Sequence, residues 1–406
     1  MTEIKSQGTN NYTPLFWLAL GTFAVGTESF MIAGLLPDIA ADLHISVVAA
    51  GQLVTVFALA YALSSPVLTA LTGAVKRRSL MIAAMVVFAL ANVLAWAARD
   101  YWMLMAARIL LAASAGIFVP GANALAGASV APERRGTALA IVNGGISIAV
   151  AFGVPLGALI GDRLGWRMTF AGVAALSVAA AIGVVFGLPR GIGANLPVAS
   201  LRERLATAKD PVILGTLLTT TLWATGAYTI YTYLAIFVTQ ATPLRGAEIG
   251  YVLFMWGAAA ALGVAIGGKS VDRYGARRVI VPALLVTVAA FMLLSGSAQW
   301  IAPSHALIPV LIGVAAWGVA HWAFYPAQQA SLIEAAGLKG ASVVLSLNAS
   351  FMYLGFSLGA ALGALTLNSV GVIDLGWVAA VCELAALGLT VALGGWRLRR
   401  VIFPAI

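Results

Sequence analysis

The stretch Gly268-Lys-Ser-Val-Asp-Arg-Tyr-Gly-Ala-Arg-Arg278 directly precedes the uncharged run VIVPALLVTVAAFMLLSGSAQW at residues 279–300. A basic loop followed by about 20 apolar residues is typical of a helix that crosses a lipid bilayer. Runs of this kind recur from end to end of the chain. Twelve are predicted, near residues 14–36, 46–71, 79–98, 102–127, 136–161, 167–189, 211–239, 247–268, 278–300, 305–333, 340–367 and 372–396.

The composition indicates the same class of protein. Of the 406 residues, 62% are hydrophobic and 9% are charged, whereas soluble proteins carry about 45–50% apolar and about 25% charged residues. These values exclude a soluble enzyme. Because barrel strands would be short alternating segments, the predicted fold is an all-α membrane protein. The single cysteine, Cys382, has no second thiol to pair with, and no metal or cofactor is expected.

The basic residues follow a clear pattern along the chain. Eighteen of the 23 lie at the termini or in the loops between alternate segments, beginning with Lys5, and four lie in the opposite loops. Since basic loops remain in the cytoplasm, both termini are expected to be cytoplasmic. The net charge of +9 then reflects topology, and no nucleic acid is expected as a partner.

The longest polar stretch, residues 190–210, divides the chain into two parts of nearly equal length. Residues 1–189 and 211–406 are predicted to be two six-helix bundles, joined by a cytoplasmic linker. Within the linker, Ser200 and Glu203 have the spacing of a capping box, which predicts a short helix on the membrane surface.

The two halves repeat several features at an offset of 200 to 206 residues. Arg77-Arg78 corresponds to Arg277-Arg278, and Gly153-x3-Gly157 corresponds to Gly355-x3-Gly359. Two pseudo-symmetric halves related by an axis along the membrane normal are a transporter architecture, with the substrate site between them near mid-membrane.

The loop quoted first resembles the GxxxDRxGxRR loop of the major facilitator superfamily, and the order of features along the whole chain agrees with that family. The resemblance implies that Asp272, Arg273, Gly275 and Arg277 form a gating latch, while the alternative is a topology anchor alone. The equivalent first-half loop has Gly73 in place of the aspartate, so the lock is expected mainly on the second half.

The first segment contains Gly26-Thr-Glu28 and, further on, Pro37-Asp38. It resembles the first helix of twelve-span drug:proton antiporters, in the branch that includes arabinose, sugar and chloramphenicol exporters. An ionised carboxylate at mid-membrane is costly, so Glu28 is expected to be a reversible proton carrier. The alternative is an acid paired or protonated for packing alone. Asp38 is a second candidate, unless it is simply solvated near the loop.

Arg108 is the one basic residue well inside a segment. It occupies the place of the family's helix-four arginine, although Leu111 and Ala112 replace the usual glutamine and glycine. Since arginine keeps its charge, Arg108 is expected to face the central cavity, and the alternative is a side chain that extends to an interface.

Gly153-Val-Pro155-Leu-Gly157 resembles the family's GPxxG antiporter motif, with Val154 before the proline. Close helix packing explains the glycines equally well. The repeat offsets also suggest polar side chains that share the cavity with Glu28 and Arg108, and Tyr231 and Tyr325 are expected around them, although membrane aromatics often lie in interfacial belts instead. These candidates are Asn123, Tyr228, Tyr231, His321, Tyr325 and Gln329.

Together these features predict a proton-coupled exporter of drugs, drug-like compounds or sugars, working by alternating access in a bacterial cytoplasmic (inner) membrane. The expected partners are a small-molecule substrate, protons and the lipid bilayer, and the expected state is a monomer. A sugar or metabolite transporter working in either direction and a non-transporting membrane sensor are the alternatives.

Overall fold

A computed structural model describes residues 12–130, 134–193 and 200–402, and over these residues the chain is helical with no β-strand. The all-α prediction is confirmed. The elements are α1 (Thr13–Asp42), α2 (Val47–Leu71), α3 (Arg77–Trp96), α4 (Tyr101–Ala128), α5 (Arg135–Ile148), the π-helix η2 (Ala149–Gly153), α6 (Val154–Leu164), α7 (Trp166–Gly187), α8 (Leu201–Ala208), α9 (Pro211–Tyr231), α10 (Leu234–Ala241), α11 (Glu248–Tyr274), α12 (Arg277–Trp300), α13 (Pro303–Ser369), the 3-10 helix η3 (Val372–Asp374) and α14 (Leu375–Ile402).

All twelve predicted segments are helical in the structure. Within its described residues, eleven helices are long and apolar enough to cross a membrane. The remaining segment, 211–239, forms α9 and α10, with a break at Thr232 and Tyr233. In α13, Gly337 has a φ of 69° and a ψ of 167° and turns the chain between two spans, a conformation that favours glycine.

Polar side chains fix where several spans begin. The Ser46 hydroxyl accepts the Ala49 N–H at the start of α2, and the Asp100 carboxylate accepts the Met103 N–H at the start of α4. The Asp210 carboxylate accepts the Val212 and Ile213 N–H groups in the first turn of α9. Because the first amides of a helix lack intrahelical partners, these caps place the turns at the ends of the apolar runs.

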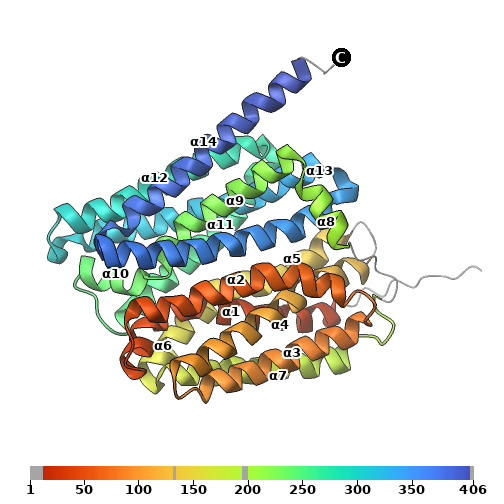
Figure 1. Ribbon diagram of the computed structural model, residues 1–406, viewed down its shortest axis with the longest axis horizontal. Coiled ribbons are helices and arrows are strands. Elements are labelled where there is room, and N and C mark those ends of the chain that lie inside the picture. Colours follow the sequence, from red (N-terminus) through yellow and green to blue (C-terminus); the bar gives the residue numbers. More distant parts are fainter. Residues whose placement is uncertain (1–11, 131–133, 194–199, 403–406) are drawn as a thin grey trace, which may run out of the picture.

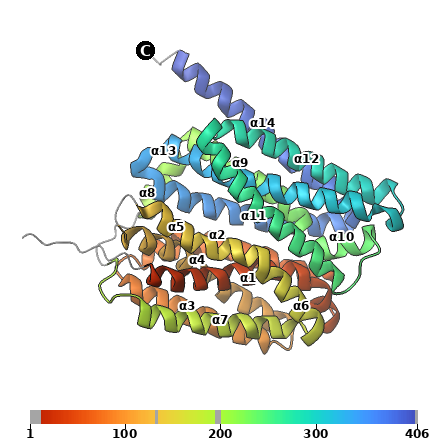
Figure 2. The same ribbon diagram turned by 180° about the vertical axis from the view of Figure 1, so that it is seen from behind.

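Figures 1 and 2 show α1 to α7 in one layer and α9 to α14 in the other, with α8 at one end of the molecule. The predicted capping box starts α8, where Glu203 accepts the Ser200 N–H at 2.7 Å. We call the end that carries α8 the linker end, and the opposite end, with the turns after α6 and α10, the far end. Lys5 and the 194–199 part of the predicted linker lie outside the described residues.

Glycines allow the helices that line the interface between the layers to approach closely. A Cβ on Gly145 of α5 would overlap the Ala19 carbonyl oxygen and the Thr22 hydroxyl of α1. In the second layer, Gly355 and Gly359 of α13 lie in the same way against the backbone of α9. These glycines on α5 and α13 therefore form the surfaces on which α1 and α9 pack.

This packing can be tested with two neighbouring glycines. Gly145→Ala should lower the melting temperature in detergent, because overpacking costs about 1–3 kcal/mol. Gly144→Ala is the matched control, since a Cβ there meets nothing within 4 Å and alanine favours helix by about 1 kcal/mol. Equal melting temperatures for the two variants would contradict the proposed contact with α1.

Candidate functional site

An ion pair is buried among α1, α2 and α4. Arg108 of α4 pairs through Nη1 with Oε1 of Glu28 on α1, and both side chains are 0% exposed. The Arg108 Nε–H donates to the carbonyl oxygen of Leu53 on α2 at 3.2 Å, and the guanidinium carbon lies 4.0 Å from the Phe57 ring centroid. The alternative in which Arg108 extends to an interface is therefore wrong.

The pair contains one acceptor atom and one donor atom that have no hydrogen-bond partner in the described residues. Oε2 of Glu28 and Nη2 of Arg108 are buried and have no hydrogen-bond partner among the described residues. A charge in this environment is tolerated only when an opposite charge and hydrogen bonds compensate it. A proton, or a polar group of a ligand, that reaches either atom would therefore change the balance of the pair.

Aromatic side chains of the second layer contact α1 beside this pair. The Phe30 ring centroid lies 6.4 Å from that of Tyr228, 6.1 Å from Tyr231 and 6.2 Å from Trp322. The Tyr231 hydroxyl donates to the carbonyl oxygen of Phe30 at 3.1 Å. The structure thus brings both tyrosine candidates, Tyr228 and Tyr231, to the first helix.

The other candidates named from the sequence make their contacts elsewhere. His321 stacks on Trp223 with centroids 3.9 Å apart, and Tyr325 lies 6.2 Å from the same ring. Asn123 donates to Val119 in its own helix at 3.2 Å, and Gln329 is half-buried one turn after Tyr325. Within the described residues, none of these four hydrogen-bonds to Glu28 or Arg108.

Asp38 is not part of this cluster. It is exposed in α1 near the far end, ten residues after Glu28, which corresponds to about 15 Å along a helix. Its acidic neighbour is Asp162 at the end of α6. The structure therefore separates the two acids of the first helix.

The predicted latch lies at the linker end, where α11 stops. Gly275 ends the helix with a φ of 83°, a conformation that favours glycine. Asp272, Arg273 and Arg277 are exposed, and the Arg273 guanidinium carbon lies 5.2 Å from the Tyr274 ring centroid. In the part of the chain that the structure describes, Asp272 makes no ion pair.

The antiporter-like motif coincides with a change of helix type. The predicted helix 136–161 is α5 and α6 separated by the π-helix η2, which ends just before Pro155. Proline lacks an N–H and clashes with the preceding turn, which accounts for the wider turn here. A Cβ on Gly153 would overlap the Thr27 hydroxyl, and one on Gly157 would contact Met31, so the motif packs against α1.

Some contacts between the two layers lie toward the far end. A Cβ on Gly51 of α2 would overlap the hydroxyl of Tyr233 in the second layer. The Ser357 hydroxyl donates to the Thr55 carbonyl oxygen at 2.9 Å. The halves are therefore in contact on the side opposite α8, and the Tyr61 and Tyr353 rings, whose centroids are 3.6 Å apart, also join them near the middle of α2.

Glu383 is a buried acid that sequence reasoning missed. It lies in α14, is 0% exposed, and neither carboxyl oxygen has a hydrogen-bond partner within the described residues. Its Oε1 would lie 3.2 Å from a Cβ on Gly226 of α9. A single acid near the middle of the apolar segment 372–396 is the signal that could have identified it.

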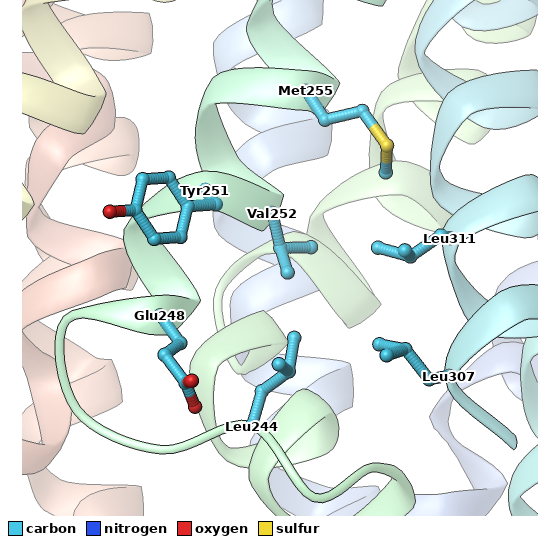
Figure 3. A pocket seen from close by; sticks show the side chains of 7 residues that line it. All are labelled: Leu244, Glu248, Tyr251, Val252, Met255, Leu307 and Leu311. Atoms are coloured by element: carbon cyan, nitrogen blue, oxygen red, sulfur yellow. The ribbon is translucent and has the colours of Figure 1, made fainter. Parts of the chain in front are cut away.

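A peripheral cavity of about 260 Å³ lies at the far end of the second layer. Figure 3 shows its side chains, which come from α11, the loop before it and the start of α13. None of the candidate site residues lines this cavity, so it is separate from the Glu28–Arg108 pair. The lining residues are Leu244, Glu248, Tyr251, Val252, Met255, Leu307 and Leu311.

Comparison with known proteins agrees with this arrangement. Residues 18–242 match the family model described as Major Facilitator Superfamily. The chain belongs to the major facilitator superfamily. A mutant of the nucleoside transporter NupG has the same fold, with a TM-score of 0.71 and 12% identity over 94% of this chain and 100% of that chain.

Several curated proteins are similar over most of this chain. It is 34% identical to the uncharacterized MFS-type transporter YbcL of Bacillus subtilis, over 93% of this chain and 95% of that protein. It is 33% identical to the inner membrane transport protein YdhP of Escherichia coli K12, over 88% and 90%. It is 35% identical to a chloramphenicol resistance protein of Streptomyces lividans, over 70% and 71%.

The energetic role of the ion pair can be tested by a double-mutant cycle. Arg108→Met should destabilise the protein by about 3–5 kcal/mol, because it leaves the Glu28 carboxylate buried without its cation. Adding Glu28→Gln should restore part of that loss. The measurement is thermal unfolding in detergent at fixed lipid content.

Asp42→Asn provides the control for this cycle. Asp42 pairs with Arg167 at 2.6 Å, but both side chains are partly exposed, so the expected change is about 0–1 kcal/mol. An Arg108→Met protein that melts like the Asp42→Asn protein would show that the buried pair does not stabilise the fold.

Proposed function

We propose that this major facilitator protein is a proton-coupled exporter of drug-like small molecules. The observation that carries the proposal is the buried Glu28–Arg108 pair, which lies beside the contact between the two layers and keeps Oε2 and Nη2 without partners in the described residues. A carboxylate in this position can exchange a proton only together with a change in its surroundings.

In this mechanism, Glu28 takes up a proton when the site faces outward. Protonation removes the negative partner of Arg108, whose charge remains and then relies on the Leu53 carbonyl and the Phe57 ring. The affinity for cargo bound beside the pair is thereby lowered, and the cargo dissociates. Proton and cargo affinities are coupled in both directions, so loss of the proton to the cytoplasm restores the cargo site.

Alternating access requires the layer contacts at the far end to open while the linker end closes. The latch of the closed linker end is proposed to consist of Asp272, Arg273, Gly275 and Arg277. We propose that α5 and α6 move against α1 at the π-helix η2 and at the motif that contains Gly153, Pro155 and Gly157. Six polar or aromatic side chains are proposed to line the cargo path, namely Tyr228, Tyr231, His321, Tyr325, Asn123 and Gln329.

The cellular setting belongs to the same proposal. The relative named as an inner membrane transport protein supports a bacterial inner membrane, and the chloramphenicol resistance relative supports a drug-like cargo. The basic loops support cytoplasmic termini, with residues 1–189 and 211–406 as the moving halves and 190–210 as their linker. A single chain is proposed to be the working unit, with Asp38 as a proton entry point.

Uphill transport tests the role of Glu28. In proteoliposomes with an imposed pH gradient, Glu28→Gln should abolish concentrative transport of chloramphenicol, because the side chain at position 28 then stays uncharged at every pH and cannot carry the proton. Glu334→Gln, at an exposed acid of α13, should transport like the parent. A Glu28→Gln protein that concentrates chloramphenicol as the parent does would refute the proposed proton carrier.

The latch predicts a shift between conformations. Asp272→Asn should favour the state closed at the far end, because it weakens the contact that holds the linker end shut. Spin labels at positions 162 and 247, in a Cys382→Ser background, would report the far-end distance. An unchanged distance distribution, with transport intact, would leave the loop as a topology anchor only.

A further inference from the structure

The second layer presents an excess of buried hydrogen-bond donors. Trp223 of α9, Trp256 of α11, and Trp317 and Trp322 of α13 are each no more than 8% exposed. No indole N–H among these four has an acceptor within the described residues. An indole nitrogen can only donate, and buried donors are rarely left without a partner.

These four tryptophans form one cluster rather than scattered sites. The Trp256 ring centroid lies 5.3 Å from Trp317 and 6.4 Å from Trp322. His321 connects the remaining ring, since it stacks on Trp223 at 3.9 Å and lies 5.8 Å from Trp322. The unused donors are therefore concentrated in one part of the molecule.

Trp322 is the member of the cluster that reaches the boundary between the layers. It lines a small cavity together with Ile146 and Ser147 of α5 and Val150 of η2. Its ring also faces Phe30 of α1, at 6.2 Å between centroids. A cargo held between the layers would meet the Trp322 indole, and rings on both sides would favour an aromatic compound.

The acidic side chains of the neighbouring helices are either paired with a cation or lie away from Trp322. Glu28 is paired with Arg108, and Asp38 is exposed toward the far end. Glu383 lies against Gly226, between α14 and α9. The charge of Glu28 is already balanced by Arg108, although its Oε2 has no hydrogen-bond partner in the described residues. Among the described residues at the boundary, no carboxylate therefore carries an uncompensated charge that could neutralise a cationic cargo, while donor groups are in excess.

We propose that the cargo is an uncharged aromatic compound whose acceptor oxygen receives the Trp322 indole N–H, and that aromatic cations are poor cargo. This inference rests on the proposed export function and adds to it the chemical class of the substrate. Carbonyl, nitro and ether oxygens on or next to a ring have the required chemistry, because they accept hydrogen bonds without carrying a net charge.

The first experiment uses the unaltered full-length protein in detergent. Binding of two uncharged nitroaryl probes, chloramphenicol and 4-nitrophenyl galactoside, is compared with binding of two aromatic cations, ethidium and tetraphenylphosphonium. At least one uncharged probe should bind at least tenfold more tightly than either cation. Equal or tighter binding of a cation, or no binding of either uncharged probe, would overturn the proposal.

The second experiment removes the single donor. Trp322→Phe keeps a ring but loses the N–H, so the uncharged probe should bind about threefold to tenfold more weakly, as expected for one lost hydrogen bond. Trp300→Phe is the matched control, because Trp300 is 73% exposed and should bind the probe like the parent. Unchanged binding by a folded Trp322→Phe protein would overturn the assignment of this donor, and the first experiment still tests the cargo class should that variant not fold.

Transport distinguishes this inference from the function on which it rests. If the uncharged probe binds through Trp322 but a pH gradient never concentrates it, the export proposal fails and the binding assignment stands. If the gradient concentrates ethidium as efficiently as chloramphenicol, the export proposal stands and the cargo class is wrong.

Discussion

Lipid offers no partner to a charge, and this constraint determines the centre of the molecule. Arg108 cannot lose its proton at any accessible pH, so its position inside the membrane requires an anion and further acceptors nearby. The structure supplies Glu28 and the Leu53 carbonyl, which means that α1, α2 and α4 must keep a fixed register. A shift of α1 or α4 would leave a buried charge unpaired, which is among the more destabilising changes a protein can undergo, and a shift of α2 would remove the Leu53 acceptor.

The same constraint explains why the spans could be predicted from the sequence. Backbone amides in lipid must be satisfied within each segment, so every apolar run had to be a helix. The segment 211–239 was the least regular, because its threonines lower its hydropathy and its helix breaks at Thr232 and Tyr233. The π turn before Pro155 could not be predicted, since a proline in a helix is compatible with a kink, a break or a wider turn.

The site was predictable only where a single residue was anomalous for its segment. Glu28 and Arg108 were identified because ionisable groups are rare at mid-membrane, but their direct pairing depends on how α1 and α4 pack. Glu383 meets the same criterion and was overlooked. The unused indole donors could not be found from the sequence, because a tryptophan in a membrane span is ordinary until its neighbours are known to lack an acceptor.

The two layers repeat their packing but not their chemistry. Gly153 against Thr27 in the first layer corresponds to Gly355 against the α9 backbone in the second, so both halves use the same kind of close helix contact. Yet the counterpart of Glu28 at an offset of 200 is Tyr228, and the first layer carries the ion pair while the second carries the aromatic donors. Under the proposed mechanism, the two halves of this pseudo-symmetric fold have different roles because they carry different side chains. In that mechanism, proton exchange belongs to Glu28 on one half, the Trp322 donor for cargo belongs to the other, and the rocking of the halves against each other is proposed to couple them.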